Sequence, residues 1–461
     1  MTRNIAQVFA ETAHAITPAT LPEAVRTKAK LHILDSIGNA LAISHDAFAD
    51  TTLHSLARFG TGDHAVIGRT ERLSLRDAMV ANGALIHTLD YDDTHTPSLN
   101  HVSACAVPLI LGLGAEHHAS GAAMLAAYVV ACETAGRLGR AVHGGFHGRG
   151  FHATALCGTF GGAVGAGHLL GLTAGQLHHA QGIALSYASG TNEWLADGAW
   201  TKRLHPGNTA VDGVTSAYFA ADDFLGVVHP YEGPRGLYAN FLADGAPVDW
   251  DFLARGIDDD WEMLNVAIKP FPLCHANHAF TDAGIALHDK GIKAADIQRV
   301  DALLHERQFG IICEPESQKK NPSSAYEAQF SLPFSFAAGL IRGRFGLAEL
   351  EPDCWGDTDI LALGQKVHHA VDPDSAFPTF YSGEVAVTLN DGTVVRHREA
   401  INRGTRERPL SHDELVAKFH DNASHGGFAD QAEAIVKTVL HLEDLPDGAT
   451  LAPLLAQQGS S

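Results

Sequence analysis

Apolar residues recur at helical spacing through most of the first 265 residues of the chain. A clear example begins at Thr20-Leu-Pro-Glu23, which has the form of a capping box with proline in the first turn. The apolar positions that follow it are Val25, Ala29, Ile33, Ile37 and Leu41. Thr173 and Gln176 predict the start of another helix in the same way. The pattern therefore predicts a helical domain over residues 1–265.

The run from Cys157 to Gly167 is rich in glycine and invites comparison with a phosphate-binding loop. A loop of that kind follows a strand and contains a lysine and a hydroxyl residue, whereas no strand-like pattern precedes this run and it lacks the lysine. We therefore interpret the run as a tightly packed, buried helix.

The pattern changes after residue 265, where strand-like segments appear. Residues 299–305 alternate between apolar and polar side chains, as a half-buried strand does. Residues 384–389 and 393–396 flank Asn390-Asp-Gly392, which predicts a hairpin and its turn. Helical spacing at 334–341 lies between these strands. Residues 266–403 are therefore predicted to form a smaller α+β domain.

The chain then returns to helix, because Ser411 and Glu414 form a further capping box and a helical pattern continues to about residue 440. We predict a mainly α protein whose large all-helical domain consists of residues 1–265 and 404–461. The α+β domain of residues 266–403 is inserted into it and is expected to act as a lid.

Composition and charge narrow the class of partner. The 461 residues include 53 acidic and 32 basic side chains, which gives a formal charge of −21. Such a surface repels phosphate backbones and anionic lipids, so nucleic-acid and membrane partners are not expected. An acidic substrate would need a locally basic site, which makes the few lysines within apolar segments candidates for binding it.

Cysteine usage and apolar runs indicate the compartment. The six cysteines lack CxxC or zinc-binding spacing, which favours reduced thiols. The first residues show no signal-like apolar core, and the most apolar stretch, near 105–130, is broken by polar residues. We expect a cytoplasmic protein without a membrane span.

The segment Asp90-Tyr-Asp-Asp-Thr-His95 is the main candidate for chemistry. It places three carboxylates within four residues, between two apolar helical patterns, and Thr94, His95 and His101 add further polar groups. Carboxylates and histidines clustered in a cleft shift one another's pKa values, as acid–base catalysis requires. Taken alone, an ordinary acidic turn explains the same residues equally well.

Two other chemistries compete for this segment. A metal site could use aspartate and histidine, but the nearby HxxxH spacing of His143 and His147 lies in a glycine-rich stretch that disfavours the helix it needs. A DxDD acid for terpene cyclisation needs an aromatic-lined cavity, and only 7% of residues are aromatic. We therefore predict no metal site.

Basic groups that could meet carboxylates occur in two further segments. Residues 200–208 contain Lys202, Arg203 and His205, and the first two can neutralise carboxylates through charge-assisted hydrogen bonds. Lys269 precedes a double-proline turn at the predicted domain junction, where ligand clefts often form. His152 follows a glycine-rich loop. Because the chain has 29 histidines, a single one is more often a surface or core residue than a catalyst, and only its polar neighbours make His152 a candidate.

Taken together, these residues resemble the MmgE/PrpD family, which includes 2-methylcitrate dehydratase, cis-aconitate decarboxylase and iminodisuccinate epimerase. The likeness runs nearly end to end, and the order and spacing of its motifs are specific. The motifs are Asp35–Gly38, Asp90–His101, Phe151-His152, Thr201-Lys202, His205, Gly207-Asn208, Lys269–Pro272, His278, Asp282-Ala283, Phe330-Ser331 and Leu442–Leu445.

The resemblance implies a helical domain built from both ends of the chain, an inserted α+β lid, a homodimer, and no metal or organic cofactor. The family's site positions match Asp90, Thr94, His101, His152, Lys202 and Lys269. The chain also departs from the family pattern. Cys274 stands where cis-aconitate decarboxylases carry a catalytic histidine, Ile311-Ile312 occupies the region of a site tyrosine, and Val102 replaces a usual proline. The Asn-Asp-Thr-Trp pattern of PrpD-type dehydratases is absent as well.

We therefore predict a lyase that acts on a small polycarboxylate by moving a proton next to a carboxylate. The predicted catalytic residues are His101, His152, Asp90 and Lys269, and the predicted substrate-binding residues are Thr94, Lys202, Arg203 and Cys274. Because the decarboxylase histidine is missing, the leading hypothesis is removal of water from a 2-methylcitrate-like acid. The alternatives are a cis-aconitate-type decarboxylase, an iminodisuccinate-type epimerase, and a non-enzymatic carboxylate- or metal-binding protein.

Overall fold

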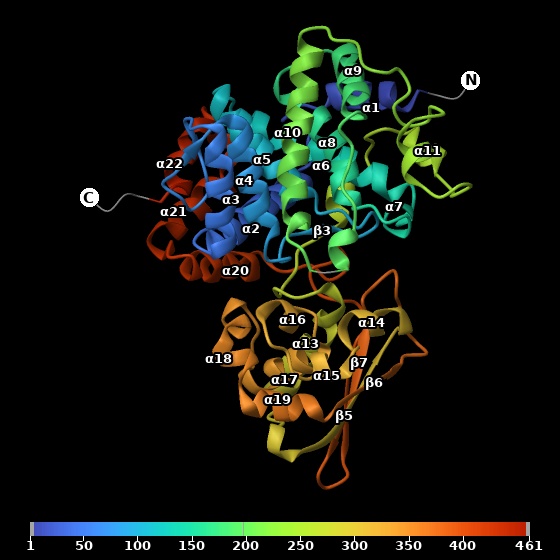
Figure 1. The fold of residues 1–461 in the computed structure, drawn as a ribbon, viewed down its shortest axis with the longest axis vertical. Helices are drawn as coiled ribbons and strands as arrows, with labels where there is room; N and C mark the ends of the chain where they lie inside the picture. The colour runs from blue at the N-terminus through green and yellow to red at the C-terminus, as the bar shows by residue number, and fades with distance from the viewer. Residues whose placement is uncertain (1–3, 197, 458–461) are drawn as a thin grey trace. The chain divides into compact units, whose positions relative to one another are not determined.

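The computed structural model describes residues 4–196 and 198–457. The chain divides into two compact units, one formed by the residues up to Ile268 together with those from Ser411 onward, and the other by Lys269–Leu410. Within the first unit, helices from the last part of the chain, red in Figure 1, pack beside blue helices from its first part. Both ends of the sequence therefore contribute to one helical core.

Helices make up nearly all of the first unit. Its α-helices are α1 (Ile5–Ala15), α2 (Glu23–Ile43), α3 (Ala47–Leu56), α4 (Leu75–His87), α5 (Val102–Glu116), α6 (Gly121–Arg140), α7 (Gly145–Gly148), α8 (Ala153–Leu169), α9 (Ala174–Ala184), α10 (Thr201–Ala221), α11 (Leu237–Phe241), α12 (Trp250–Leu253), α20 (His412–His425), α21 (Ala429–Leu440) and α22 (Ala452–Leu455). Short strands form two antiparallel pairs, β1 (His64–Ala65) with β2 (Arg72–Leu73) and β3 (Thr94–His95) with β4 (Val266–Ala267).

The long helix α10 crosses α4 and α8 at points where backbone meets backbone. A Cβ atom added to Gly207 of α10 would lie 2.4 Å from the carbonyl oxygen of Val80 in α4. A Cβ atom added to Gly213 would lie 2.4 Å from the carbonyl carbon of Gly162 in α8. Only glycine permits so close an approach, so these contacts fix the position of α10 against both neighbours.

The glycine-rich run from Cys157 to Gly167 is the middle of α8, and every residue of it is buried. This helix packs against α5, α6 and α10. The prediction of a buried, closely packed helix is therefore confirmed, because small side chains are what allow three helices to surround it.

The second unit contains a four-stranded sheet whose strand order is β6-β5-β7-β8. Strands β5 (Ile297–Leu304) and β6 (Val367–Val371) are parallel, whereas β7 (Gly383–Leu389) is antiparallel to both β5 and β8 (Val394–Glu399). Helix α13 (His278–Asp289) packs against β7, β8 and α17 (Leu332–Arg342). The other helices of the unit are α14 (Phe309–Ile312), α15 (Glu316–Lys319), α16 (Ala325–Gln329), α18 (Pro352–Trp355) and α19 (Thr358–Gln365).

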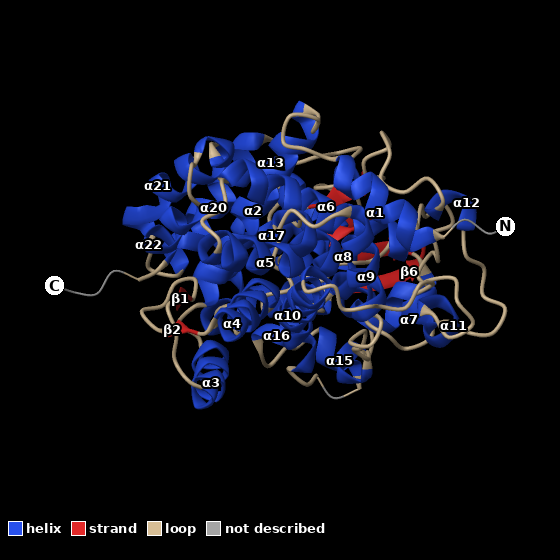
Figure 2. Cartoon of the chain, turned by 90° about the horizontal axis from the view of Figure 1, so that it is seen from above, coloured by secondary structure: helices blue, strands red, loops and turns tan. Residues whose placement is uncertain are grey.

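The mainly α class predicted from the sequence is confirmed, and Figure 2 shows how few strands accompany the helices. The predicted strand at 299–305, the hairpin around Asn390–Gly392 and the helix at 334–341 form as β5, as β7 with β8, and as α17. The part predicted to be all-helical differs in detail, because it contains the two short strand pairs. The role of the α+β unit as a lid stays a prediction.

The predicted helix starts had different outcomes. Thr173 and Ser411 each form a complete capping box, as predicted. The prediction at Thr20 is wrong, since α2 begins at Glu23 and its N-cap is Pro22. The Thr20 hydroxyl instead donates a hydrogen bond to the carbonyl oxygen of Thr17 (3.0 Å), a local turn that competes with capping. The final helical stretch is divided into α20 and α21 at Gly426–Phe428.

All six cysteines are free thiols. Among the described residues, no helix combines the length and the apolar character that crossing a membrane requires.

Candidate active site

The acidic segment Asp90–Asp93 follows α4 and is held by side chains from several other helices. Asp90 has a φ of +51°, a left-handed conformation that redirects the chain after the helix. Asp92 and Asp93 are almost completely buried. Buried carboxylates need hydrogen-bond donors or opposite charges, and each residue of the segment has such a partner.

Asp92 lies between two histidine rings. Its Oδ2 accepts a hydrogen bond from Nδ1 of His87 (2.7 Å) and lies 3.2 Å from Nδ1 of His101. The His101 nitrogen also lies 2.8 Å from the backbone carbonyl oxygen of Asp93. Since both neighbours of this nitrogen are acceptors, it carries the proton, and Nε2 of a neutral His101 keeps its lone pair. The same assignment holds for His87.

Asp93 anchors the segment to α2 and α5. Its Oδ2 accepts hydrogen bonds from Nδ1 of His32 (2.5 Å) and from the hydroxyl of Ser103. Its Oδ1 accepts a hydrogen bond from the backbone N–H of Ser103 (3.2 Å). The Ser103 hydroxyl also contacts the hydroxyl of Tyr128 (2.5 Å). With three donors on its oxygens, Asp93 holds the segment in place.

The more exposed end of the segment carries an ion pair. Nζ of Lys202 donates a hydrogen bond to Oδ1 of Asp90 at 3.0 Å, and the two side chains are 17% and 20% exposed. The same ammonium group lies 5.1 Å from the centroid of the Trp194 ring. Tyr91, between the two aspartates, receives a hydrogen bond from Lys418 at its carbonyl oxygen (3.0 Å), and Lys418 also lies over its ring.

His152 completes a group of three histidine rings. Its ring centroid lies 5.8 Å from that of His87 and 6.2 Å from that of His101. Its Nδ1 lies 2.9 Å from Nδ1 of His205, so one of these nitrogens donates to the other.

Three helix N-termini meet around this group. His101 is the N-cap residue of α5, His152 is the N-cap residue of α8, and Lys202 lies in the first turn of α10. Each helix N-terminus carries a partial positive charge and unpaired N–H groups, which favour an anion. Lys202 and these N–H groups are the positive groups of the site that a carboxylate can pair with, in a chain whose formal charge is −21.

Burial keeps two histidines of this site, His87 and His152, neutral. It lowers the pKa of His87 to about 4, and burial together with the charge of Lys202 lowers the pKa of His152 well below its ordinary value. Burial alone would raise the pKa of Asp92, but the His87 and His101 rings hold it well below its ordinary value. Asp92 is therefore an anion beside the neutral imidazole of His87.

Three buried polar atoms of the site have no hydrogen-bond partner within the described part of the chain: Nε2 of His87, Oδ1 of Asp92 and Oγ1 of Thr94. Buried polar atoms are usually paired, because leaving one without a partner costs about 1–3 kcal/mol. Unpaired atoms grouped around one segment indicate a place where a ligand supplies the missing partners.

The next residue after Thr94 belongs to a different network. His95 points to the other face of β3, since successive side chains of a strand alternate, and its Nε2 lies 2.8 Å from Oε2 of Glu262. Asn265 donates to the same oxygen (3.1 Å), and Arg140 donates to the other one. Burial alone would raise the pKa of Glu262, but His95 and Arg140 bring it to about 2.

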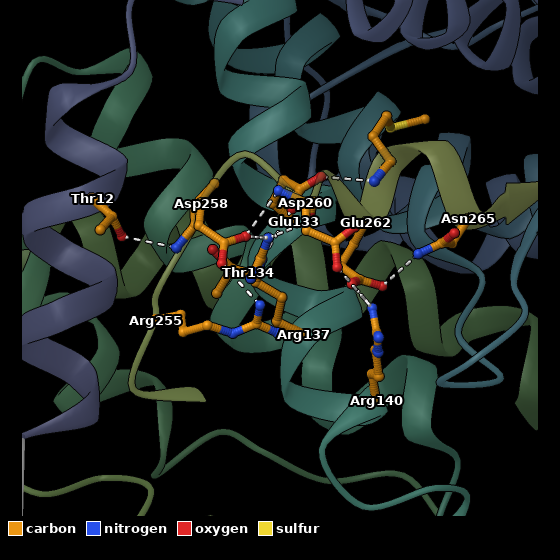
Figure 3. A network of polar contacts seen from close by, with 12 residues as sticks. Thr12, Glu133, Thr134, Arg137, Arg140, Arg255, Asp258, Asp260, Glu262 and Asn265 are labelled. Carbon is orange, nitrogen blue, oxygen red and sulfur yellow. Dashed lines mark hydrogen bonds and ion pairs between the residues drawn. The ribbon is translucent and has the colours of Figure 1, made fainter. Parts of the chain in front are cut away.

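This network continues along α6, as Figure 3 shows. The fully buried Arg137 donates to Glu133 (3.1 Å) and to Asp258 (2.8 Å). The second oxygen of Glu133 accepts from the backbone N–H of Met263 (2.7 Å). The network thus ties α6 to the segment before β4, which in turn pairs with β3.

The structure brings most of the predicted site residues together. Asp90, Thr94, His101, His152 and Lys202 all belong to the first unit and lie on or beside the acidic segment or the ring group. The guanidinium of Arg203 has a different setting, over the rings of Phe48 (4.7 Å) and Trp200 (5.4 Å). Lys269 and Cys274 belong to the second unit, so their participation stays a prediction.

Sequence reasoning missed His87 as a member of the site. It is the last residue of α4, and its separation of five residues from Asp92 matches no common motif. His32 was also missed, because a separation of 61 positions in the sequence hides its contact with Asp93. The useful signal was local: His87, Asp90, Asp92 and Asp93 stand within seven residues of sequence.

Two sets of side chains could in principle hold a metal ion. One comprises His87, His101 and His152, and the other Asp90, Asp92 and His101; in each set the potential ligand atoms lie within 4.8 Å of one another.

Two domain families match successive parts of the chain. The MmgE/PrpD N-terminal domain matches residues 7–250, and the MmgE/PrpD C-terminal domain matches residues 271–444. The two matches together cover both units described above.

The chain is also similar to known enzymes over nearly its whole length. It is 29% identical to a cis-aconitate decarboxylase of Mus musculus, over 99% of this chain and 94% of that protein. The corresponding human enzyme is 28% identical (99% and 95%), and one from Aspergillus terreus is 25% identical (94% and 92%). The prediction that the protein is a lyase is confirmed, and the chain belongs to the MmgE/PrpD family.

Proposed function

We propose that this protein is a carboxy-lyase that removes carbon dioxide from cis-aconitate or a closely similar unsaturated tricarboxylate. The observation that carries the proposal is the meeting of Lys202 and three helix N-termini with the rings of His101 and His152. The named relatives, all cis-aconitate decarboxylases, support this reaction over the dehydration favoured from the sequence.

The reaction consumes one proton for each carbon dioxide released. The bond between the methylene carbon of cis-aconitate and its carboxylate breaks, and its electron pair forms a new carbon–carbon double bond. The electrons of the old double bond move to the alkene carbon that bears another carboxylate, and that carbon takes up the proton. A trianion and a proton thus give a dianion and carbon dioxide. The site must stabilise the developing negative charge and deliver the proton.

The residues of the first unit supply these functions. Lys202 and the helix N-termini offer positive charge to the carboxylates. One of the rings of His101 and His152 delivers the proton, and Asp92 orients His101 through Nδ1. The buried hydroxyl of Thr94 is available to donate a hydrogen bond to a substrate carboxylate. Lys269 is the predicted second positive group.

The test is incubation of the purified enzyme with cis-aconitate in deuterated water. We expect carbon dioxide and an unsaturated dicarboxylate that carries one deuterium on its new methylene group, as measured by NMR. An absence of carbon dioxide from cis-aconitate and from related unsaturated tricarboxylates would contradict the proposal. Exchange of hydrogen for deuterium without loss of mass would point to an epimerase, and binding without turnover to a carboxylate-binding protein.

A second candidate is dehydration of a 2-methylcitrate-like hydroxy acid. The observation that favours it is Cys274, which stands where the decarboxylases of this family carry a catalytic histidine. The same arrangement of Lys202 and histidines would then help remove a proton next to a carboxylate while hydroxide leaves. A rise in ultraviolet absorbance from the new double bond, without carbon dioxide, would identify this reaction.

A further inference from the structure

The three histidine rings of the site are oriented in a common way. Nδ1 of His87 and Nδ1 of His101 both face Asp92 (2.7 and 3.2 Å), and Nδ1 of His152 faces His205 (2.9 Å). The nitrogen that remains on each ring is Nε2. That of His87 is buried and has no hydrogen-bond partner among the described residues. All three rings are buried or nearly so.

The spacing of the rings suits a tetrahedral ion. One nitrogen of each ring lies within 4.8 Å of one nitrogen of each of the others. Zn²⁺ bonds to histidine nitrogen at about 2.0 Å with tetrahedral angles, which places ring centroids about 5 Å apart. The centroids here are 4.6 Å apart for His87 and His101, 5.8 Å for His87 and His152, and 6.2 Å for His101 and His152. These distances lie on both sides of that spacing, so the rings must shift to close around an ion.

The surroundings of the rings also resemble those of a zinc site. Metal-bound histidines commonly donate their other N–H to a carboxylate, which fixes the tautomer and makes the ring a better ligand. Asp92 has this relation to two of the three rings and is itself completely buried. The competing set of Asp90, Asp92 and His101 is less suitable, because Asp90 is engaged by Lys202 at 3.0 Å.

We propose that the substrate-free protein binds one Zn²⁺ ion through Nε2 of His87, His101 and His152, with Asp92 as the supporting carboxylate, and that this ion excludes the polycarboxylate. The ion is an inhibitor, since it occupies the nitrogens that would otherwise move the proton. The competition rests on the proposed function, whereas the binding of zinc does not.

Binding is tested first on the unmodified, substrate-free protein. Metal-free enzyme is titrated with Zn²⁺ in competition with a chromophoric chelator near neutral pH, and Co²⁺ is used in parallel as a coloured substitute. We expect one tight site per chain and a Co²⁺ spectrum typical of tetrahedral nitrogen coordination. Failure to bind Zn²⁺ in competition with the chelator, or an octahedral Co²⁺ spectrum, would overturn the proposal.

Variants then locate the ion. His152→Gln and His101→Gln should each weaken Zn²⁺ binding by about 100-fold or more, since even supporting residues contribute 10–100-fold. His147→Gln is the matched control, because its ring lies 6.2 Å from that of His152 but outside the group of three. Asp90→Asn tests the competing set of ligands. Thermal melting verifies that each variant is folded.

The variants give a decision in every case. Retention of tight binding by folded His152→Gln or His101→Gln would place the ion elsewhere and overturn the proposal. A loss in His147→Gln or Asp90→Asn as large as that in His152→Gln would do the same. If a glutamine variant does not fold, the cobalt spectrum and stoichiometry of the unmodified protein still decide.

Inhibition is measured separately with cis-aconitate, at free Zn²⁺ concentrations buffered against chelation by the substrate. We expect one equivalent of bound Zn²⁺ to remove at least about 90% of activity, and added chelator to restore it. Tight binding without any decarboxylation by the metal-free enzyme would contradict only the proposed function. Full activity of the zinc-loaded enzyme would overturn the inhibitory role.

Discussion

Two buried polar clusters meet at β3, one reached from Thr94 and the other from His95, and they differ in how completely their atoms are paired. In the cluster of His95, both ring nitrogens have partners, and both oxygens of Glu133 and of Glu262 accept hydrogen bonds. In the cluster of Asp92, a ring nitrogen, a carboxylate oxygen and a hydroxyl lack partners among the residues that the structure describes. The first cluster leaves one terminal nitrogen of Arg137 without a partner among the described residues, whereas the second leaves three atoms unpaired around one short segment, where a ligand can supply their partners.

Burial alone does not separate the two clusters, since both contain groups that are almost inaccessible to solvent. Their chemistry differs instead. The cluster of His95 surrounds its acids, Glu133 and Glu262, chiefly with Arg137 and Arg140, whose guanidinium groups keep their charge and do not exchange protons near neutral pH. The cluster of Asp92 combines an acid with histidines, which do exchange them. The contrast leads to tests that should affect stability in one cluster and activity in the other.

The largest effect is expected from His152→Gln. Loss of the ring removes a proton donor, so kcat should fall by about 10²- to 10⁴-fold on the best substrate. The free energy of unfolding should change little, because glutamine can still bond to His205. His147→Gln serves as the control and should keep kcat within about threefold. A His152→Gln variant with kcat close to that of the unmodified enzyme would remove this residue from the mechanism.

Arg137→Met should have the opposite signature. It leaves Glu133 buried without its cation, which costs about 3–5 kcal/mol of stability as measured by urea denaturation. KM of the molecules that remain folded should be unchanged. Arg140→Met, whose side chain is 31% exposed, should cost less. If the Arg137 variant were as stable as the unmodified protein, the cluster of His95 would not stabilise the fold.

Lys202→Met tests the positive charge of the site. A hydrogen bond to a charged group contributes about 1.5–3 kcal/mol, so kcat/KM should fall by about 10- to 100-fold, with the fold retained. Arg203→Met is the comparison on the same helix, and the ring packing of Arg203 predicts a change in stability rather than in KM. Equal kinetic losses in both variants would mean that α10 contributes only a general positive field.

The cluster of His95, which includes Glu133, should also make the free energy of unfolding depend on pH. Burial raises the pKa of Glu133 to about 7, so the folded state keeps a proton that the unfolded state releases above its ordinary value of 4.5. The free energy of unfolding, relative to that of Glu133→Gln, should therefore fall as pH rises from 4.5 to 7, by at most about 1.4 kcal/mol per pH unit. A difference that is constant, or that grows with pH, would contradict this.

The smallest effect is expected from Thr94→Val. The hydroxyl has no partner within the described part of the chain, so its removal should not lower stability. The loss of one hydrogen bond to substrate should raise KM by about two- to tenfold. Thr134→Val is the control, because its buried hydroxyl donates to the carbonyl oxygen of Val130 (2.9 Å). It should lose stability and keep its KM, and the reverse result in either variant would break the comparison.

Elements that depend on neighbouring residues could be predicted from the sequence. The hairpin around Asn390–Gly392 forms as predicted, because its turn residues and alternating strands are adjacent in the chain. The capping boxes at Thr173 and Ser411 are local in the same sense. Thr20 shows the limit of prediction from local motifs. Its hydroxyl bonds to the carbonyl oxygen of Thr17 in a competing turn, and the helix begins at Glu23 instead.

The site was only partly predictable, because its atoms come from distant segments. No single motif identified the predicted residues. Their polar neighbours in the sequence and the family resemblance pointed to Asp90, Thr94, His101, His152 and Lys202. The pairing of Asp92 with His87 and of Asp93 with His32 depends on helix packing that no sequence spacing specifies. Arg203 looked equivalent to Lys202 in the sequence. Successive residues of a helix point in different directions, so Lys202 meets Asp90 whereas Arg203 lies over the ring of Phe48.

The glycine contacts of α10 have a mechanical consequence. At Gly207 and Gly213 the helix touches its neighbours with backbone atoms, so there are no side chains whose rotations could absorb a displacement. Lys202 lies in the first turn of the same helix, and Pro206, which separates it from both crossings, lacks the N–H that would bond to the carbonyl oxygen of Lys202. A larger side chain at Gly207 or Gly213 would therefore shift the body of α10 directly, and would shift the first turn with Lys202 only as far as the backbone at Pro206 transmits the movement.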